Sequence, residues 1–347
     1  MINNPLISVI IPAFNVSETL ENCINSLFQQ SYSNFEIILI NDGSIDDTWE
    51  KALMLASKDD RLKVFNQNNL GVSPTRNRAL QLASGDYFCC VDADDSVNSQ
   101  YLENLKNGIY KGNDKGLVIQ QLKFLDSNGS SLDSINIEFN DEVVEENNYS
   151  VLFTKYEIIK FGFNCGKLYN LNLVREYDLK YAESITISED LIFMLEYILK
   201  TEYIHFIKGN DYNYITTAYT LHDTKFASFS SEKELLRKYL FVLDAYKLKF
   251  NLSYETLKYA YFNSGDIFMR LVYSMYRLNN NLPKKNVRIK EIRNTVEEFK
   301  FCLQHYWLPN KTKEKLSKIL LMNRAYRIFD RFRIFIRSSQ LKRIAKV

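Results

Sequence analysis

The chain has 347 residues, of which 46% are hydrophobic and 25% charged, proportions typical of a globular protein with a sizeable core. No apolar run approaches the ~18 residues of a membrane span, and five cysteines without a CxxC pair argue against a zinc site or a disulfide framework, so a reducing cytosol is expected. The net charge of +2 hides an asymmetry. From Lys311 onward twelve basic residues face two acidic ones, so this segment carries +10 and the rest of the chain −8.

Alternating strands and helices are predicted over the first hundred residues. Continuous apolar and β-branched runs predict buried strands, and apolar residues at helical spacing predict the helices between them. In chain order these are a strand at 7–11, a helix with an apolar face at 20–28, a strand at 35–40, a helix at 47–57, a strand at 62–65, a helix at 73–83 and a strand at 87–91. Asn15 and Glu18 have the spacing of a capping box for the first helix. The alternation predicts a parallel sheet with right-handed crossovers.

A polar cluster follows each predicted strand, where ligands bind in such sheets. The clusters cover residues 12–15, 41–44, 66–71 and 92–95. Because the carboxyl ends of parallel strands meet at one edge, the four clusters are expected to line one site. The last cluster places three carboxylates in four residues at the end of a buried strand. A divalent cation with its phosphates would offset their repulsion, whereas a solvated acidic turn is the alternative for a DxD taken alone.

The remainder of the chain divides into a mixed region and a helical region. Between residues 116 and 215 the patterns predict a strand at 117–125, helices at 147–161 and 189–199, and short strands at 203–207 and 212–215. From residue 230 onward only helices are predicted, at 231–250, 253–279, 286–304 and 312–337, with breaks near Pro283 and Pro309.

Six motifs occur in an order that resembles the family 2 glycosyltransferases with a GT-A fold. They are SVIIPAFN (8–15), INDGS (40–44), NLGVSPTRN (69–77), ASGDY leading to DADD (83–95), GKLY (166–169) and SEDLIF (188–193). The resemblance covers roughly residues 6–215. It implies an α/β fold in which a Rossmann-like nucleotide-binding half is fused to a mixed-sheet acceptor half, followed here by an all-α C-terminal extension. The expected domains are 1–225, with a nucleotide-sugar half at 1–110 and an acceptor half at 111–225, and a helical region at 226–347 with a basic amphipathic tail.

The resemblance also implies a binding site for a nucleotide-sugar. The residues expected to bind it are Pro12, Ala13, Phe14, Glu18, Asp42, Asn69, Arg76 and Asp92. The first three would cradle a uracil base, Asp42 would accept a hydrogen bond from it, and Arg76 would place a fixed cation near phosphate. For Glu18, a contact with the ribose and a plain capping role are both open.

The chemistry of the reaction is expected from three further positions. Asp92 would approach the ribose, and Asp94 would bind Mn²⁺ or Mg²⁺, which prefer hard oxygen ligands. Asp190 would be the catalytic base that takes the proton of the acceptor hydroxyl, at the start of a helix whose dipole favours an anion. Glu189 and Asp190 could instead be first-turn acids that stabilise this helix. Lys167 would lie on the acceptor side or make a structural salt bridge.

Two positions depart from the pattern of this family. Ser188 stands where many relatives have glycine, which could alter the loop before Asp190. Ile215 stands where relatives often carry a basic residue after a tyrosine pair, so a phosphate or metal contact from this segment is in doubt. His222 is the nearest alternative for that contact, unless it is simply a surface histidine.

The last predicted helix combines an apolar stripe with a basic face. The stripe comprises Ala325, Phe329, Phe332 and Ile336, and the basic face comprises Arg324, Arg327 and Arg331. Such a helix in the segment 311–347 could lie on an anionic membrane surface, or its stripe could pack onto the preceding helices. No nucleic-acid partner is expected, because no recognition motif accompanies the charge.

The resemblance therefore predicts a bacterial hexosyl- or N-acetylhexosaminyl-transferase. It would move a sugar from a UDP-sugar to a glycan or lipid-linked saccharide in surface polysaccharide synthesis, with metal and with inversion. A cytoplasmic location is expected, with a peripheral position at the inner face of the cell membrane left open. The alternatives are a sugar nucleotidylyltransferase, whose Gly-rich, Lys-containing signature is absent near the first strand, and a catalytically silent, membrane-docked nucleotide-sugar-binding protein.

Overall fold

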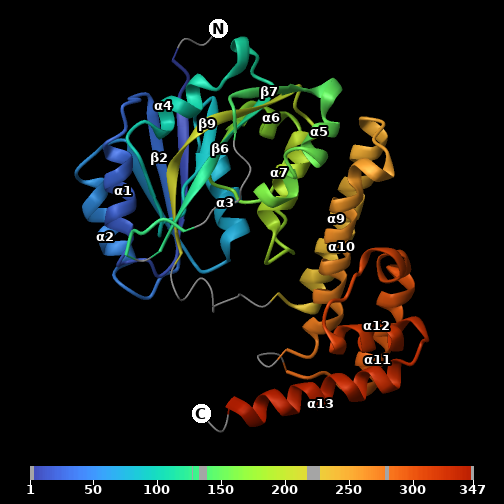
Figure 1. The fold of residues 1–347 in the computed structure, drawn as a ribbon. Helices are drawn as coiled ribbons and strands as arrows, with labels where there is room; N and C mark the ends of the chain where they lie inside the picture. The colour runs from blue at the N-terminus through green and yellow to red at the C-terminus, as the bar shows by residue number, and fades with distance from the viewer. Residues whose placement is uncertain (1–3, 127, 133–138, 217–226, 278–280, 345–347) are drawn as a thin grey trace. The chain divides into compact units, whose positions relative to one another are not determined.

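A computed structural model describes residues 4–126, 128–132, 139–216, 227–277 and 281–344 (Figure 1). The chain divides into an α/β unit, residues 1–183 and 190–224, and a helical unit, residues 184–189 and 225–347. The α/β class with a helical C-terminal region is thereby confirmed. The domain limits given above, including the division at residue 110, stay a prediction.

The α/β unit is built on one nine-stranded sheet in the order β3-β2-β1-β4-β8-β6-β9-β5, with β7 beside β9 (Figure 1). The strands are β1 (Ile7–Ala13), β2 (Phe35–Asp42), β3 (Leu62–Gln67), β4 (Tyr87–Cys90), β5 (Ser96–Val97), β6 (Gly116–Asp126), β7 (Glu142–Glu145), β8 (Lys167–Asn170) and β9 (Tyr203–Thr216). Strands β3, β2, β1 and β4 are parallel, as predicted. Because β8 is antiparallel to both of its neighbours and β6 is parallel to β9, the other half of the sheet is mixed.

Helices follow the parallel strands and bury them. The helices of this unit are α1 (Leu20–Phe28), α2 (Thr48–Ala56), α3 (Val72–Leu82), α4 (Tyr101–Asn107), α5 (Ser150–Thr154), α6 (Leu171–Glu176) and α7 (Glu189–Ile198). All eight residues of β2 are buried, as its continuous apolar run predicts for a strand covered on both faces.

The start of the first helix differs from the prediction. Helix α1 begins at Leu20 after Thr19, and no side chain caps it. The Asn15 side chain instead accepts a hydrogen bond from the Ile45 backbone N–H at 2.9 Å. The capping box of Asn15 and Glu18 is therefore wrong, because Asn15 joins the loops after β1 and β2 rather than the helix.

The mixed region also differs in detail. The two short strands predicted at 203–207 and 212–215 are one strand, β9, whose register against β6 shifts between Gln120 and Leu122. The helix predicted at 147–161 consists of short α5 between two 3₁₀ turns, and Glu157 interrupts it with a φ of 46°. Strands β5, β7 and β8 were not predicted, because segments of two to four residues are too short to show an alternation of apolar and polar residues.

A buried carboxylate, Glu36, ties the parallel strands together. Its Oε1 accepts hydrogen bonds from the Ser8 hydroxyl at 2.7 Å and from the backbone and hydroxyl of Ser84 at 2.7 and 2.8 Å. Its Oε2 lies 2.7 Å from the Lys63 ammonium. Burial favours the protonated form, but these donors outweigh it and lower the pKa of Glu36 to about 2. Glu36 is therefore ionised in the folded protein at neutral pH.

The helical unit contains five α-helices among its described residues. They are α9 (Phe229–Lys249), α10 (Tyr254–Ser274), α11 (Lys285–Glu298), α12 (Thr312–Met322) and α13 (Tyr326–Ile344), with a π-helical turn at Cys302–Tyr306. The helix predicted at 312–337 is broken into α12 and α13, because the chain turns at Arg324 with a φ of 56°. The helix predicted at 286–304 ends at Glu298. The last residues of the helix predicted at 253–279 lie outside the described residues.

Helix α13 is anchored to the helices before it. The buried Asp330 carboxylate accepts hydrogen bonds from the Arg288 guanidinium at 2.7 and 2.9 Å and from the Tyr276 hydroxyl at 2.8 Å. Phe329 and Ile336, both from the predicted apolar stripe, are buried. That stripe therefore packs inside the helical unit, whereas Ile328 and Phe335 are exposed. No helix of the described residues is long and apolar enough to span a membrane.

Candidate functional site

The loops that follow β1, β2 and β3 are joined to one another. The Asn15 backbone N–H donates to the Ser44 hydroxyl at 2.9 Å. Gly43 has a φ of 70°, and a Cβ there would lie 2.6 Å from the backbone nitrogen of Asn69, so only glycine permits this approach. The structure thus brings three of the four predicted polar clusters together.

Asp42 holds the loop after β3. Its Oδ1 accepts hydrogen bonds from the Leu70 backbone N–H at 2.9 Å and the Gln67 side chain at 2.7 Å, and its Oδ2 accepts one from the Gly71 backbone N–H at 2.8 Å. Since each carboxylate oxygen can accept two hydrogen bonds, Oδ2 retains room for one more donor. Contact between Asp42 and a base stays a prediction, and it would use that remaining position.

The other residues predicted to bind the nucleotide-sugar lie on β1 or on the loops that follow β1 and β3. Ala13 is buried at the end of β1, and Pro12 beside it is half-buried. Phe14 is 44% exposed, although a large aromatic ring is normally buried. Glu18 and Asn69 are exposed on the adjoining loops. An exposed ring above a fixed backbone is suited to stacking against a planar ligand.

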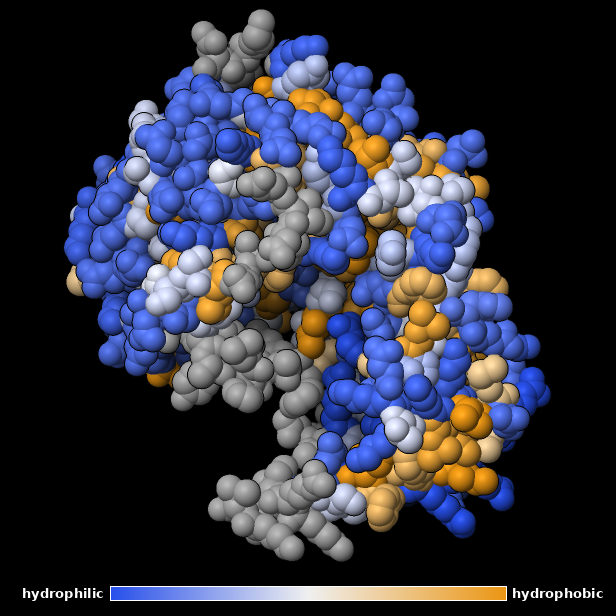
Figure 2. Space-filling view, viewed as in Figure 1, coloured by the Kyte–Doolittle hydropathy of each residue, from blue (hydrophilic) through white to orange (hydrophobic). Residues whose placement is uncertain are grey.

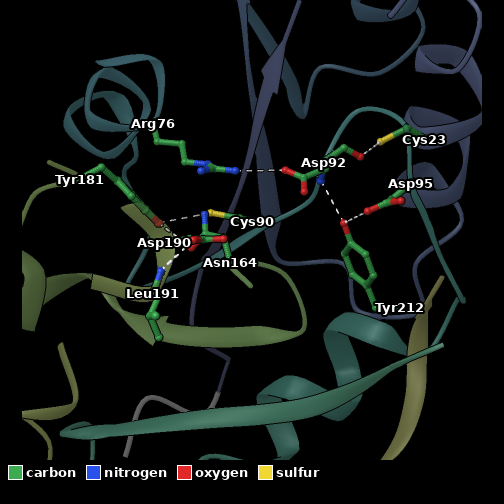
Figure 3. Close-up of polar contacts among 10 residues, drawn as sticks. All are labelled: Cys23, Arg76, Cys90, Asp92, Asp95, Asn164, Tyr181, Asp190, Leu191 and Tyr212. Atoms are coloured by element: carbon green, nitrogen blue, oxygen red, sulfur yellow. Dashed lines mark hydrogen bonds and ion pairs between the residues drawn. The ribbon is translucent and has the colours of Figure 1, made fainter. Parts of the chain in front are cut away.

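Arg76 and Asp92 form an ion pair beyond the end of β4. The Arg76 Nη2 atom lies 3.3 Å from the Asp92 Oδ1 atom, and the guanidinium lies over the Tyr181 ring at 5.5 Å (Figure 3). Arg76 is buried on α3, whereas Asp92 is partly exposed. A buried cation beside an accessible carboxylate provides a fixed positive charge for an anionic ligand.

Tyr212 of β9 holds the acidic loop. Its oxygen accepts the Asp92 backbone N–H at 3.0 Å, and its hydroxyl donates to Asp95 Oδ2 at 2.7 Å (Figure 3). The other oxygen of Asp95 accepts the Ile215 backbone N–H at 2.7 Å. Both Tyr212 and Asp95 are buried, so Asp95 is a positioning residue that fastens the loop to β9.

Asp94 is the member of this cluster that lacks a partner. Its carboxylate receives no hydrogen bond from another residue among those the structure describes. Burial and the negative charge of Asp92 raise the pKa of Asp94, and its own backbone N–H opposes them only in part. A hard divalent cation fits such a carboxylate group, as predicted for Mn²⁺ or Mg²⁺.

A second group of possible ligands is less suited to such a cation. Ligand atoms of Asp92, Asp95 and Cys165 lie within 4.8 Å of one another. However, both oxygens of Asp95 are hydrogen-bonded to β9, and burial together with Asp92 and Asp95 raises the pKa of the Cys165 thiol well above its usual range. A protonated thiol is a poor ligand for Mg²⁺ or Mn²⁺. Asp94 remains the better candidate.

Asp190 lies in the first turn of α7. Its Oδ1 accepts the Leu191 backbone N–H at 2.8 Å (Figure 3). Burial raises the pKa of Asp190, and the positive charges of Arg76 and Lys167 oppose this rise. The charges of Arg76 and Asp92 therefore act on the pKa of Asp190, although Asp190 lies about one hundred positions further along the chain.

Lys167 is a buried cation beside this centre. It is only 2% exposed, and its ammonium donates to the backbone carbonyls of Phe163 and Cys165. It forms no ion pair within 4 Å among the described residues, so the salt-bridge alternative is wrong. Burial lowers the pKa of Lys167 to about 8, despite the opposing charge of Asp190.

Residues that the sequence did not single out join α3 to the segment before α7. The Asn77 side chain on α3 both donates to and accepts from the Tyr181 backbone, at 2.9 and 2.8 Å. The Tyr181 hydroxyl donates to Asn164 Oδ1 at 2.7 Å (Figure 3). Asn77 and Tyr181 lie 104 positions apart, so no local pattern could reveal their contact. His222, the alternative to Ile215, lies outside the described residues.

The sequence is similar to those of known proteins. A family model described as "Glycosyl transferase family 2" matches residues 8–178. The chain is 30% identical over 352 aligned positions to the cholesterol galactosyltransferase of Borreliella burgdorferi, with 95% of this chain and 96% of that protein covered. It is also 44% identical over 101 residues to the uncharacterized glycosyltransferase EpsJ of Bacillus subtilis, a match that covers 29% of each chain.

Two solved structures are similar over almost the whole chain. Residues 1–349 of TarS from S. aureus, in complex with UDP-GlcNAc, give a TM-score of 0.63 at 17% identity and cover 96% of this chain and 92% of that one. The mannosyltransferase PcManGT from Pyrobaculum calidifontis, in complex with GDP-Man and Mn²⁺, gives a TM-score of 0.52 at 11% identity, with 96% and 88% covered. At these identities the likeness concerns the fold alone, which is of the GT-A type.

Proposed function

The chain belongs to glycosyltransferase family 2, and from this premise we propose that it transfers a hexosyl or N-acetylhexosaminyl group from a UDP-sugar with inversion and with a divalent metal ion. The acceptor would be a glycan or a lipid-linked saccharide. Because the matching family and relatives are glycosyltransferases, the alternatives of a nucleotidylyltransferase and a silent binding protein are set aside. One observation carries the proposal: the Arg76–Asp92 ion pair follows β4, and the charges of both residues act on the pKa of Asp190 in the first turn of α7.

The donor would occupy the edge of the sheet where the loops meet. Pro12, Ala13 and Phe14 would face the uracil, and Asp42 would use the free position on its Oδ2 atom. Asp92 would approach the ribose while Arg76 holds its carboxylate in place. A complex of the TarS structure contains UDP-GlcNAc, which supports a UDP-sugar as donor here.

The metal ion would be held by Asp94, whose carboxylate is otherwise unpartnered among the described residues. When bound, Mn²⁺ or Mg²⁺ neutralises charge on the departing diphosphate. Asp95 and Tyr212 would keep the loop in place, because they fasten it to β9. The presence of Mn²⁺ in the PcManGT structure supports this assignment.

Asp190 would act as the catalytic base. It would accept the proton of the acceptor hydroxyl as the oxygen attacks the anomeric carbon opposite the leaving nucleoside diphosphate. The new glycosidic bond forms as the bond to the diphosphate breaks, so an α-linked donor gives a β-linked product. Burial raises the pKa of Asp190 and so increases its basicity, while Arg76 and Lys167 favour its ionised form.

The biological setting would be the assembly of bacterial surface polysaccharide in the cytoplasm. A lipid-linked acceptor is supported by the cholesterol galactosyltransferase, whose name gives a membrane lipid as its substrate. Exposed apolar side chains on α12 and α13 would then meet the inner face of the membrane, and they include Ile319, Met322, Ile328 and Phe335. Orange side chains lie among blue ones over the visible face of α11 and α12 (Figure 2).

The charge of the same segment favours an anionic membrane surface. Arg327 and Arg331 are exposed on α13 beside Ile328 and Phe335. Deleting 311–347 would remove buried core, so the test is the double variant Ile328→Ser and Phe335→Ser. We expect it to bind vesicles of phosphatidylglycerol less than the parent chain does, whereas equal binding would refute a membrane role for this face.

The reaction itself is tested with a donor panel. UDP-galactose, UDP-glucose, UDP-GlcNAc and UDP-GalNAc are incubated with the full chain, with MnCl₂ or with EDTA, and released UDP is measured. We expect one donor to be consumed only with the metal. Asp94→Asn should raise the Mn²⁺ requirement by about tenfold or more, while the exposed control Asp60→Asn leaves it unchanged. No turnover of any donor, or full activity in EDTA, would contradict the proposal.

A further inference from the structure

A cavity of about 360 Å³ opens in the helical unit, away from any residue assigned above. Helices α9 and α10, which pack side by side in Figure 1, contribute to its walls together with the segment 298–306. Its size falls within the range of small-molecule sites, roughly 300–1,000 Å³. The side chains that line it are mainly aromatic, with a few polar groups.

Three tyrosine rings give this cavity an apolar surface. Tyr254, Tyr261 and Tyr306 have nearly parallel rings, with centroids 5.0–6.2 Å apart and interplanar angles of 16–21°. Tyr261 and Tyr306 are buried, whereas Tyr254 is 43% exposed. Phe301, which is 58% exposed, stands edge-on to Tyr306 at 5.2 Å. The buried rings therefore fix the orientation of an exposed ring face that a ligand can cover.

Polar groups with spare hydrogen-bonding capacity lie beside these rings. Asp244 receives only a long hydrogen bond of 3.4 Å from the Tyr261 hydroxyl. Lys247, one turn further along α9, forms no ion pair with any residue that the structure describes. Burial, together with the charge of Asp244, raises the pKa of Tyr261 to about 12, so its hydroxyl stays a donor at neutral pH. The cavity thus offers both acceptors and donors.

Aromatic rings beside hydrogen-bond donors and acceptors are suited to binding a neutral saccharide. A pyranose ring has a face of C–H groups that can cover an aromatic ring and an edge of hydroxyls that both donate and accept. A nucleotide or phosphate would meet the carboxylates of Asp244 and Glu298 with only Lys247 as an unpaired cation. An alkyl chain would make no hydrogen bond with Asp244 or Lys247, which line the cavity.

We propose that this cavity binds a neutral hexopyranose unit of a saccharide chain. The site would hold a glycan through the helical unit, and it does not depend on the donor chemistry proposed for the α/β unit. Its position between α9 and α10 gives it a rigid wall, because the two helices pack along their length. Binding to one sugar unit would be weak, because Tyr254 and Phe301 leave the site partly exposed to water.

The test is saturation-transfer NMR on the full chain with methyl β-D-galactopyranoside, methyl β-D-glucopyranoside and methyl N-acetyl-β-D-glucosaminide. Tyr254→Ala should weaken binding of at least one glycoside about tenfold, which is the effect expected for an aromatic stacking partner. Asp244→Asn should weaken it as well. The matched control is Tyr259→Ala, because Tyr259 is 68% exposed on the same helix and does not line the cavity.

Thermal melting of each variant verifies that it is folded. The proposal is overturned if the parent chain gives no signal with any of the three glycosides, if neither Tyr254→Ala nor Asp244→Asn changes the signal, or if Tyr259→Ala removes as much of it. A chain that binds the glycosides but consumes no UDP-sugar would refute the proposed reaction and leave this site standing. A chain that consumes UDP-sugar but binds none of the glycosides would refute this site and leave the proposed reaction standing.

Discussion

The substitution Tyr212→Phe isolates the contribution of one hydroxyl group to the acidic loop. The phenyl ring would keep its packing against Tyr101, whose ring lies 5.7 Å away. Two groups would lose their partner, namely the partly buried Asp92 backbone N–H and the buried Asp95 carboxylate. Leaving a buried group unsatisfied costs roughly 1–3 kcal/mol, so the two losses together should lower the free energy of unfolding by about 3 kcal/mol. Because the loop loses its attachment to β9, affinity for UDP-sugar and Mn²⁺ should fall too.

Urea denaturation and titration with UDP and MnCl₂ measure the two effects. Tyr214→Phe is the matched control, since Tyr214 lies on the same strand and its hydroxyl makes no hydrogen bond to another described residue. The control should lose less than about 1 kcal/mol. If Tyr212→Phe is no less stable than Tyr214→Phe, or binds UDP as tightly as the parent chain, the hydroxyl does not hold the loop and the reasoning is refuted.

Three other substitutions probe separate features. Glu36→Gln should cost about 3 kcal/mol of stability at pH 7, because the pKa of Glu36 is about 2 in the folded protein and ordinarily 4.5. The parent chain should lose this stability as the pH falls from 4.5 toward 2. The free energy of unfolding, measured by denaturation at each pH in that range, should therefore change less with pH in the variant than in the parent chain. Ser188→Gly should raise the free energy of unfolding by roughly 0.5–1 kcal/mol, since Ser188 has a φ of 68°, and a decrease in denaturation midpoint would contradict this. Lys167→Met should shift the acidic limb of the pH–rate profile to higher pH, because it removes a positive charge that lowers the pKa of Asp190. An unchanged acidic limb would show that the charge of Lys167 does not affect the pKa of Asp190.

The parallel half of the sheet could be predicted from the sequence because its strands are continuous apolar runs. The run at 35–40 became β2, all of it buried, and the polar clusters after β1 to β4 lie where such sheets bind ligands. By contrast, β5 has only two residues and pairs with β9, more than one hundred positions away. Pairings of this kind depend on tertiary contacts and leave no local pattern.

The motifs indicate candidate site residues whose roles stay a prediction, and the contacts that support these residues could not be predicted. The motifs indicated Asp92, Asp94 and Asp190, yet nothing local joins Tyr212 to Asp95 or Asn77 to Tyr181. The helix at 312–337 was predicted as one because its apolar spacing runs through the turn at residue 324. The apolar stripe of α13 left two alternatives open, and the burial of Phe329 beside Asp330, which Arg288 holds, shows that the stripe packs onto the preceding helices.

The central claim is that Asp190 is the base of an inverting sugar transfer, and Asp190→Asn tests it most directly. The variant keeps the shape of the side chain and removes its basicity. We predict that it binds the UDP-sugar donor and Mn²⁺ as the parent chain does in calorimetry, while the rate of sugar transfer falls by about 10²–10⁴. The exposed Asp178→Asn serves as control and should transfer at the parent rate. A transfer rate for Asp190→Asn within about tenfold of the parent rate would contradict the account.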